Sequence, residues 1–554
     1  MDLKLKLRLI ALVILIGIFA VLYADDVPQE ETIPEAVPKS FLKTSRRNIV
    51  DGKGNAIILR GVNLGGWLVP EGYILKFEGK YDRPRTIDGL IVDLIGEEKA
   101  KEFWSAYRKK YIAEKDIETI ASLGFNHVRV PFHYNLFISE DDPGAWKEDG
   151  FEILDDLINW CSEYGLYVIL DMHCAPGGQT GANIDDSIDD QPDLWTSDLN
   201  KQKTVDVWRK IAERYKDNTT VIGYDLLNEP IASKFPKYDN EKDLIPLYKA
   251  IVSAIREVDS NHIIFLEGSN WGNNFKKFPE PFDSNVVYSF HKYWDKTDKN
   301  SIKDYLRLAE KHNVPLWCGE TGENNNQWYY ACMQLFEDYN IGWSFWAWKK
   351  VESESGIYSI KKPAGYDAII HYTKSGSKKP AVKQPQETLD EFIDNLSIEN
   401  CRYNPKVVQG LLKTIPMTVE TEDFGYLGEG VSYHDAGKTN EGKSYRRSEG
   451  VDVEISSYNV GWTESGEWLK YDIYSPADKK YNIEFRVASA VDESQFRLEI
   501  DDKDVTGPMT VENTGGWSEW KIITREGIEI SKGRHKVRLY VIKGGFNIDW
   551  FRFK

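Results

Sequence analysis

Two glutamates stand where apolar runs of the sequence end, and together they could act as an acid and a base. Glu229 follows the run Val221–Asn228, and Pro230 after it cannot continue a strand. Glu320 closes the run Val314–Glu320, directly after Gly319, a residue that lets other groups approach the backbone closely. Paired carboxylates suit glycosidic bond cleavage, with one as acid/base and the other as nucleophile or base. A single glutamate of this kind would be a solvated loop charge or a structural ion pair, so the pair carries the hypothesis.

Other apolar runs end in polar or aromatic side chains that could bind a substrate. These residues are Arg129, His173, Asn228, His291, Tyr293 and Trp346. Valine, isoleucine and leucine would be expected if such positions only packed a core. His173 and His291 also fit buried core histidines, and we expect them to position groups rather than transfer protons. The set indicates a binding site around the two glutamates.

Eight apolar runs between residues 48 and 350 must position these side chains. The runs are Ala56–Asn63, Asn126–Pro131, Tyr167–His173, Val221–Asn228, His262–Glu267, Asn285–His291, Val314–Glu320 and Gly342–Trp348. Helix-patterned segments such as Asp149–Tyr164 separate them, which predicts an α/β fold with a (β/α)₈ TIM barrel over residues 46–373. A doubly wound open sheet is the alternative, but the glycines of Gly61–Trp67 have the wrong spacing for a phosphate loop.

The pattern changes beyond the barrel. Residues 374–416 are a charged, proline-containing linker followed by a helical stretch near Leu389–Leu412. Short alternating runs then predict an all-β jelly-roll or β-sandwich over residues 417–554. The runs are Glu467–Ile473, Tyr481–Val487, Phe496–Ile500, His535–Val541 and Phe546–Phe553.

The first 24 residues resemble a secretory signal peptide. Lys4, Lys6 and Arg8 precede an apolar run that is short for a membrane span, and Ala24 suits a cleavage site. Leu22 is large for position −3 of such a site, so an uncleaved N-terminal anchor is the alternative. Such an anchor would be the one contact with a membrane that we expect. Residues 25–45 form a polar linker. Either outcome exports the protein to the medium, the periplasm or the cell surface.

The charge and the cysteine content of the sequence argue against some classes of partner and of stabilising site. The net charge of −18 argues against a nucleic-acid partner, which requires a basic face. The five cysteines form no CxxC pair, which argues against a structural zinc site. Their odd number leaves at least one thiol unpaired, which argues against a disulfide framework. We expect a monomer.

The barrel region resembles glycoside hydrolase family 5, the large cellulase and β-glucanase family, over about residues 45–375. Asn228-Glu229-Pro230 resembles its acid/base motif and Gly319-Glu320 its nucleophile motif. Arg129 in VRVP, His173 in DMH, His291 and Tyr293 in HKY, and Trp346 in SFWAWK resemble its substrate-contacting positions. RGVNLGGW and MHCAPGGQTG look most like the exo-β-1,3-glucanase branch. One departure is GETGE, which places Glu323 beside the nucleophile, and we assign Glu320 because it ends the strand.

The resemblance implies retaining hydrolysis of a β-glucan, with β-1,3-glucan favoured and no cofactor for catalysis. Glu229 would be the acid/base and Glu320 the nucleophile, with Arg129 holding Glu320 ionised. Alternatives within the family are an endo-β-1,4-glucanase, a mannanase or a glycolipid hydrolase. The non-enzyme alternative is a carbohydrate-binding scaffold.

Residues 417–554 resemble carbohydrate-binding module family 6, through VETED, GEWLKYDI, NTGGWSEW and FNIDWFRF. The resemblance implies that Tyr445 and Trp517, both in loop-like contexts, sandwich a sugar that Asn547 hydrogen-bonds. We expect the remaining tryptophans of the module, Trp462, Trp468, Trp520 and Trp550, to pack in its core. Glu420, Glu422 and Asp549 resemble the family's structural calcium site, and a solvated acidic edge is the alternative.

Overall fold

The computed structural model describes residues 40–140, 142, 144–375, 378–381, 383–443, 445–455 and 457–554. The predicted signal peptide or anchor, residues 1–24, and most of the predicted 25–45 linker lie outside these residues. Within the described ranges, no helix is both long and apolar enough to cross a bilayer.

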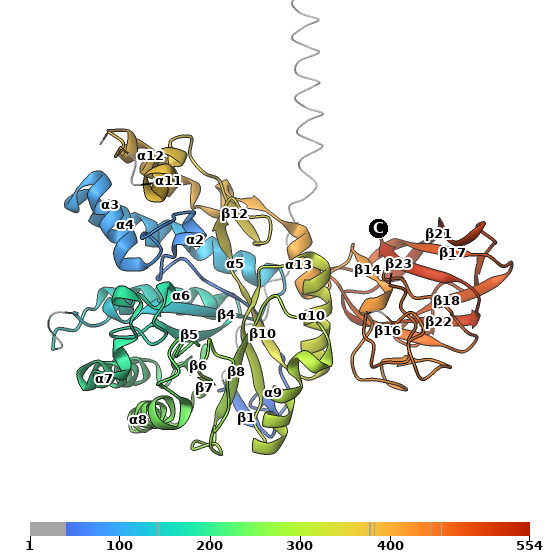
Figure 1. Ribbon diagram of the computed structural model, residues 1–554, viewed down its shortest axis with the longest axis horizontal. Helices are drawn as coiled ribbons and strands as arrows, with labels where there is room; N and C mark the ends of the chain where they lie inside the picture. The colour runs from blue at the N-terminus through green and yellow to red at the C-terminus, as the bar shows by residue number, and fades with distance from the viewer. Residues whose placement is uncertain are drawn as a thin grey trace, which may run out of the picture.

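A closed barrel of eight parallel strands forms the first part of the chain, which confirms the predicted (β/α)₈ fold (Figure 1). The strands are β3 (Arg60–Asn63), β4 (His127–His133), β5 (Tyr167–Cys174), β6 (Val221–Asp225), β7 (Ile263–Glu267), β8 (Val286–Lys292), β9 (Leu316–Gly322) and β10 (Gly342–Trp346). Each of the eight predicted apolar runs overlaps one of these strands, and β4, β5, β8 and β9 extend one or two residues beyond their runs. The runs are apolar throughout because helices cover one face and barrel side chains the other.

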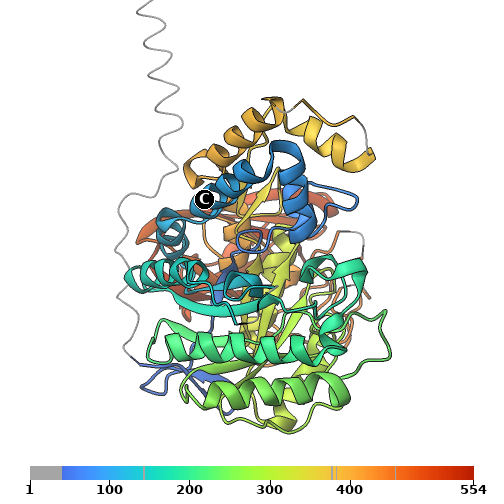
Figure 2. The same ribbon diagram turned by 90° about the vertical axis from the view of Figure 1, so that its left-hand side faces the viewer.

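Helices wrap the barrel, as the view in Figure 2 shows from the side. They are α2 (Gly72–Leu75), α3 (Pro84–Ile95), α4 (Glu97–Tyr111), α5 (Glu114–Ser122), α6 (Asp149–Glu163), α7 (Asp198–Tyr215), α8 (Ile245–Arg256), α9 (Lys299–His312), α10 (Asn326–Asp338) and α11 (Tyr366–Ser375). Two small sheets flank the barrel, β1 (Lys43–Ser45) with β2 (Asn48–Val50), and β11 (Lys349–Val351) with β12 (Tyr358–Ile360) and β13 (Arg402–Tyr403).

The barrel interior divides into an apolar end and a polar end. Ile169, Ile222, Phe265 and Trp317 belong to one fully buried apolar cluster inside the barrel. Farther along the same strands the buried side chains are charged, such as Asp171 after Ile169 and Glu267 after Phe265. The strands are parallel, so all their carboxyl ends, and these charges, meet at one mouth.

The predicted helical stretch after the barrel consists of two helices, α12 (Lys383–Asn395) and α13 (Pro405–Leu412). Pro405 opens α13 at a position where a missing N–H costs nothing. The chain then enters a β-sandwich of two antiparallel sheets, ordered β14-β23-β17-β21 and β15-β16-β22-β18-β19, with β20 paired to β18. Its strands are β14 (Thr418–Glu420), β15 (Tyr433–His434), β16 (Trp468–Ser475), β17 (Lys479–Ser489), β18 (Ser494–Ile500), β19 (Lys503–Asp504), β20 (Met509–Val511), β21 (Gly516–Ile530), β22 (Gly533–Lys543) and β23 (Asn547–Phe553).

The expected core role of four tryptophans in this sandwich is wrong. Trp462 is 52% exposed, and Trp468, Trp520 and Trp550 are half-buried. Trp468 and Trp550 lie on outward positions of strands whose buried residues alternate with less buried ones. Arg486 and Arg552 lie over the rings of Trp520 and Trp550, at 4.7 and 4.6 Å from the centroid. Smaller phenylalanine, valine and isoleucine side chains fill the core instead.

The sandwich packs against α10 and α13 of the barrel domain (Figure 1). Tyr330 of α10 belongs to the sandwich's own apolar core, and its hydroxyl donates to the carbonyl of Asp472 at 3.1 Å. Buried Glu337 of α10 accepts from Arg60 of the barrel at 2.7 Å and from Lys413, which joins α13 to the sandwich, at 3.0 Å. Shared core and buried ion pairs of this kind fix one domain against the other.

Candidate active site

The barrel mouth contains a pocket of about 770 Å³. Its lining residues are Glu71, Tyr73, His173, Ile184, Asn228, Glu229, Trp271, Asn273, His291, Tyr293, Trp294, Asp295, Glu320, Glu323 and Trp346. Seven of the eight residues proposed for the barrel site from sequence are in this set, and the eighth, Arg129, is buried and bonded to two of them.

Glu229 occupies a constrained backbone position beyond β6. Its φ is +45°, in the left-handed region that non-glycine residues rarely adopt. The backbone N–H of Glu229 donates to Glu267 Oε2 at 2.7 Å, and its carbonyl accepts from the Thr180 hydroxyl at 2.8 Å. These bonds hold the conformation, which places the carboxyl inside the pocket.

Glu320 lies on β9 and is held by two charged or polar donors. Arg129 Nη1 donates to Oε1 at 2.8 Å, and the Tyr293 hydroxyl donates to Oε2 at 2.7 Å. Arg129 itself is fully buried and is fixed by Asp225 at 2.9 Å and by Asn228 at 2.8 Å. Glu323, the neighbouring acid, instead forms an ion pair with Lys350. The contacts therefore distinguish the two acids as the sequence interpretation did.

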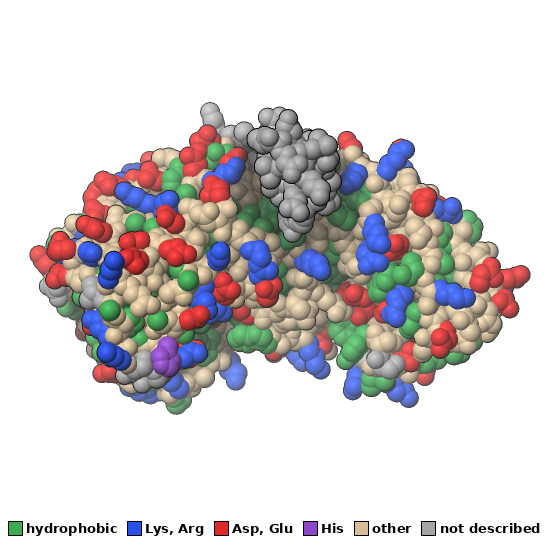
Figure 3. Space-filling model, turned by 90° about the horizontal axis from the view of Figure 1, so that it is seen from above, with side chains coloured by type: hydrophobic (Ala, Val, Ile, Leu, Met, Phe, Trp, Pro, Cys, Tyr) green, Lys and Arg blue, Asp and Glu red, His purple; other side chains and the backbone are tan. Residues whose placement is uncertain are grey.

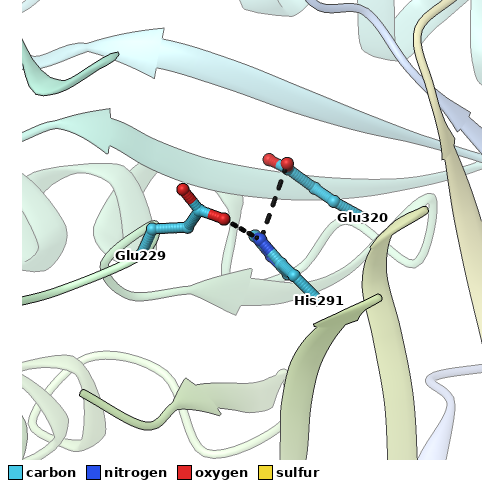
Figure 4. A group of neighbouring side chains, drawn as sticks. All are labelled: Glu229, His291 and Glu320. Carbon is cyan, nitrogen blue, oxygen red and sulfur yellow. Dashed lines mark hydrogen bonds and ion pairs between the residues drawn. The ribbon is translucent and has the colours of Figure 1, made fainter. Parts of the chain in front are cut away.

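His291 joins the two candidate glutamates, as Figure 4 shows. Its Nδ1 lies 2.8 Å from Glu229 Oε1 and 3.5 Å from Glu320 Oε2, and its Nε2 lies 3.0 Å from Glu267. One oxygen of Glu229, one oxygen of Glu320 and one nitrogen of His291 all lie within 4.8 Å of one another.

The environment shifts the pKa values of the Glu229 and Glu320 carboxyls in opposite directions. Burial raises the pKa of Glu229, and the nearby charges of Glu320 and Glu267 raise it further against the opposing effect of His291. Burial acts on Glu320 as well, but His291, Arg129 and the Tyr293 hydrogen bond together hold its pKa below the ordinary value. One carboxyl is thus suited to carry a proton while the other stays ionised.

An aromatic wall closes one side of the pocket. Trp346, 3% exposed, stacks on His173 with ring centroids 5.4 Å apart and planes 9° from parallel. The indole N–H of Trp346 donates to the Tyr73 hydroxyl. His173 Nδ1 lies 2.8 Å from Asp171, a contact that, with the Glu320 and Glu71 charges, outweighs burial and raises the pKa of His173. The carboxylate fixes the imidazole, which supports a positioning role.

Several residues of the site were missed from sequence. Asp171, Asp225 and Glu267 orient Arg129, His173 and His291 from beneath the pocket. Their signal was a charged residue inside an otherwise apolar run or, for Glu267, at the end of one. Glu71 gave no such signal, because it lies on a loop after β3. It is 1% exposed, its Oε1 has no hydrogen-bond partner, and burial raises its pKa to about 8.

In the sandwich, the structure does not bring Tyr445 and Trp517 together. Trp517, 47% exposed at the start of strand β21, lines a cleft of about 620 Å³ with Asn547 and Trp462. Tyr445 is half-buried at the domain interface, where its hydroxyl bonds Thr297 at 2.8 Å and Asp423 at 3.0 Å. The predicted pairing of Tyr445 with Trp517 is therefore wrong, because the two rings lie in different cavities, and it is Trp462 that shares the cleft with Trp517.

The acidic residues expected to hold calcium fit a cation only in part. Glu422 is buried with Oε2 unpaired, and burial together with Asp549 raises the pKa of Glu420 to about 7. Both features indicate negative charge that is not neutralised. Asp549, however, is engaged by Arg486. Among the described residues, the group whose ligand atoms meet within 4.8 Å is Glu229, His291 and Glu320, and not these three.

Comparison with known proteins agrees with this geometry. The model described as "Cellulase (glycosyl hydrolase family 5)" matches residues 92–352, and "Carbohydrate binding module (family 6)" matches residues 441–554. Similar proteins include a beta-xylosidase of Phanerodontia chrysosporium, 29% identical over 60% of this chain and 75% of that one. Endoglucanase C of Acetivibrio thermocellus is 29% identical over 47% of this chain and 90% of its own. A probable glucan 1,3-beta-glucosidase A of Aspergillus fumigatus is 32% identical over 52% of this chain and 70% of its own.

The barrel, its paired carboxylates and these relatives define a glycoside hydrolase with a polysaccharide or oligosaccharide substrate. The chain belongs to glycoside hydrolase family 5 and carries a C-terminal family 6 carbohydrate-binding module. Family 5 membership supports a reaction that needs no metal or other cofactor.

Proposed function

We propose that this protein is an exported, retaining β-glucanase that cleaves β-glucosidic bonds by double displacement. The observation that carries the proposal is the Glu229–Glu320 pair, with oxygens within 4.8 Å and pKa values shifted apart. Retaining enzymes hold their two carboxyls about 5–5.5 Å apart, whereas inverting enzymes leave room for a water between them.

In the first step, Glu229 donates its proton to the leaving oxygen while Glu320 attacks the anomeric carbon. In the second step, water attacks the glycosyl-enzyme, and Glu229 takes the proton from that water. Arg129 and Tyr293 keep Glu320 ionised before attack, and Asn228, fixed by Arg129, is placed to bind the sugar 2-hydroxyl. Trp346 offers a flat apolar face for the sugar ring.

β-1,3-Glucan is the favoured substrate. The support is the similarity to a relative named probable glucan 1,3-beta-glucosidase A. The relative named endoglucanase C supports β-1,4-glucan as the second candidate. Product profiling on laminarin, carboxymethyl-cellulose, mixed-linkage glucan and mannan distinguishes them. Preferred release of glucose or laminari-oligosaccharides from laminarin supports the proposal, and preferred cleavage of cellulose or mannan contradicts it.

The C-terminal module is proposed to hold the enzyme on its polysaccharide through Trp462, Trp517 and Asn547. Two exposed indole rings with a neighbouring amide suit the apolar faces and hydroxyls of a pyranose. Calcium remains a proposal for Glu420 and Glu422, whose hard oxygen ligands it would neutralise. Export and a monomeric state are proposed as well, export from residues 1–24 of the sequence.

A further inference from the structure

A second groove, of about 970 Å³, lies between the two domains and begins beside the catalytic pocket. Trp294 and Asp295, in the loop after β8, line both the pocket and this groove. The opposite wall comes from the C-terminal module and includes Tyr445 and Tyr458. The surface that leaves the active site past Trp294 is therefore built by both domains.

The groove presents aromatic faces to solvent. Trp294 is 77% exposed and Tyr458 50% exposed, which are unusual values for such large apolar side chains in a lined cavity. One face of Trp294 stacks on Tyr293, with centroids 5.3 Å apart and planes at 28°. Tyr293 in turn binds Glu320 through its hydroxyl. The other face of Trp294 is left for a ligand that reaches the catalytic pair.

Polar groups surround these rings in the manner of a sugar site. Amide side chains on the barrel wall, Asn300, Asn324 and Asn325, line the groove opposite Arg447 and Ser448 of the module. Amides and hydroxyls bond sugar hydroxyls, while flat rings cover the apolar faces of the pyranose. Charges of both signs are interspersed over the described part of the face seen in Figure 3, and the charged residues that line the groove, such as Asp295, Lys296 and Glu422, are likewise of both signs.

Both walls are already fixed in place. The Trp328 indole donates to the carbonyl of Asp295 at 2.8 Å, which braces the loop that carries Trp294. Tyr445 bonds Thr297 of the barrel and packs edge-on against Tyr458, with centroids 6.2 Å apart. Tyr339, the residue after α10, also donates to the Tyr426 carbonyl of the module at 2.9 Å. A groove held in this way needs no domain movement to bind a chain, which lowers the cost of binding.

We propose that this interdomain groove binds the part of the β-glucan chain that extends out of the catalytic pocket past Trp294. The inference rests on the proposed function and deepens it, because the module then forms part of the active-site cleft in addition to its own cleft at Trp462 and Trp517. The occupant is a neutral glycan chain continuous with the sugar at Glu229 and Glu320.

The test compares chain-length dependence in the full-length protein. For Tyr458→Ala, the ratio of kcat/KM on laminarihexaose to kcat/KM on an aryl β-glucoside falls about 3- to 10-fold, through KM, because one stacking contact is lost. Trp146→Ala is the matched control, since Trp146 is an exposed barrel aromatic, 40% accessible, away from both cavities. An unchanged ratio in a folded Tyr458→Ala enzyme overturns the proposal.

A binding measurement separates this inference from the proposed function. Calorimetry with laminarihexaose uses the Glu320→Gln, Trp517→Ala chain, in which turnover and the module's own cleft are both removed. Adding Tyr458→Ala weakens the Kd about 3- to 10-fold if the groove binds glycan. Equal affinity with and without Tyr458 overturns the groove. If the wild-type enzyme cleaves no β-glucan but Tyr458→Ala still weakens laminarihexaose binding, the proposed function is wrong and the groove proposal is supported.

Discussion

One carboxylate oxygen of Glu229 and one of Glu320 lie within 4.8 Å of each other, although 91 positions separate the residues in sequence. Glu229 follows β6, whereas Glu320 lies near the end of β9. His291 contacts both, and Arg129 with Tyr293 bonds only Glu320. This asymmetry shifts the pKa values of two chemically identical carboxyls in opposite directions, which is what the proposed acid/base and nucleophile roles require.

The pH dependence of the reaction follows from these shifts. The active form needs Glu320 ionised and Glu229 protonated, so kcat/KM falls below the lowered pKa of Glu320 and above the raised pKa of Glu229. On an aryl β-glucoside we expect a bell whose limbs lie on either side of the ordinary glutamate pKa of 4.5. With a dinitrophenyl leaving group, which needs no acid, Glu229→Gln should lose the alkaline limb. An alkaline limb unaltered by Glu229→Gln would refute the acid assignment.

Tyr293→Phe removes one of the two donors that hold Glu320 ionised. The pKa of Glu320 then rises, so the acid limb of kcat/KM moves to higher pH, and kcat/KM falls about 10- to 100-fold for a lost bond to a charged group. Tyr164→Phe is the control, because its hydroxyl bonds exposed Glu114 far from the pocket. An acid limb in the same place in Tyr293→Phe as in the wild type would contradict the role of Tyr293.

Binding to insoluble glucan tests the sugar site proposed for Trp462 and Trp517. In the Glu320→Gln chain, Trp462→Ala and Trp517→Ala should each reduce the bound fraction, with affinity about tenfold weaker for the loss of one ring from a sugar sandwich. Tyr445→Phe, which loses a domain-interface hydroxyl but no ring, should bind as the parent does. Unchanged binding by Trp462→Ala would contradict a sugar site formed by Trp462 and Trp517.

Thermal unfolding with calcium or a chelator tests the acidic cluster. Burial and Asp549 raise the pKa of Glu420 to about 7, so its ionisation costs folding free energy above the ordinary pKa of 4.5, and a bound cation removes that cost. Calcium should therefore raise the Tm more at pH 8 than at pH 5, and Glu420→Gln with Glu422→Gln should abolish the response. Equal Tm values with calcium and with chelator at pH 8 would exclude the site.

The barrel could be predicted because each of its strands has a recognisable local sequence pattern. A strand buried on both faces is apolar throughout, so each of the eight runs marks one strand, and the end of each run marks the mouth. Arg129 and His291 could be found in this way, as could the two glutamates. Asp225, inside one run, and Glu267, at the end of another, were overlooked. Their shared partner Arg129 lies 96 positions before Asp225 and 138 before Glu267, so no local pattern links them.

The module was harder because its sugar cleft depends on which loop residues meet in space. Trp462 comes 55 positions before Trp517, and nothing in the local sequence separates an exposed tryptophan from a core one. Tyr445 looked equally suited, yet its position at the domain interface depends on Thr297 of the barrel. Contacts between domains are invisible to a pattern read along one chain segment.

The central claim is that Glu320 is the nucleophile of a retaining enzyme, and azide rescue tests it most directly. Glu320→Gly should lower kcat on a dinitrophenyl β-glucoside by a factor on the order of 10⁴. Added azide should then enter the vacated space, restore turnover and give the α-glucosyl azide, because a single displacement inverts the anomeric carbon. Undiminished activity of Glu320→Gly, or a β-glucosyl azide as its product, would contradict the assignment.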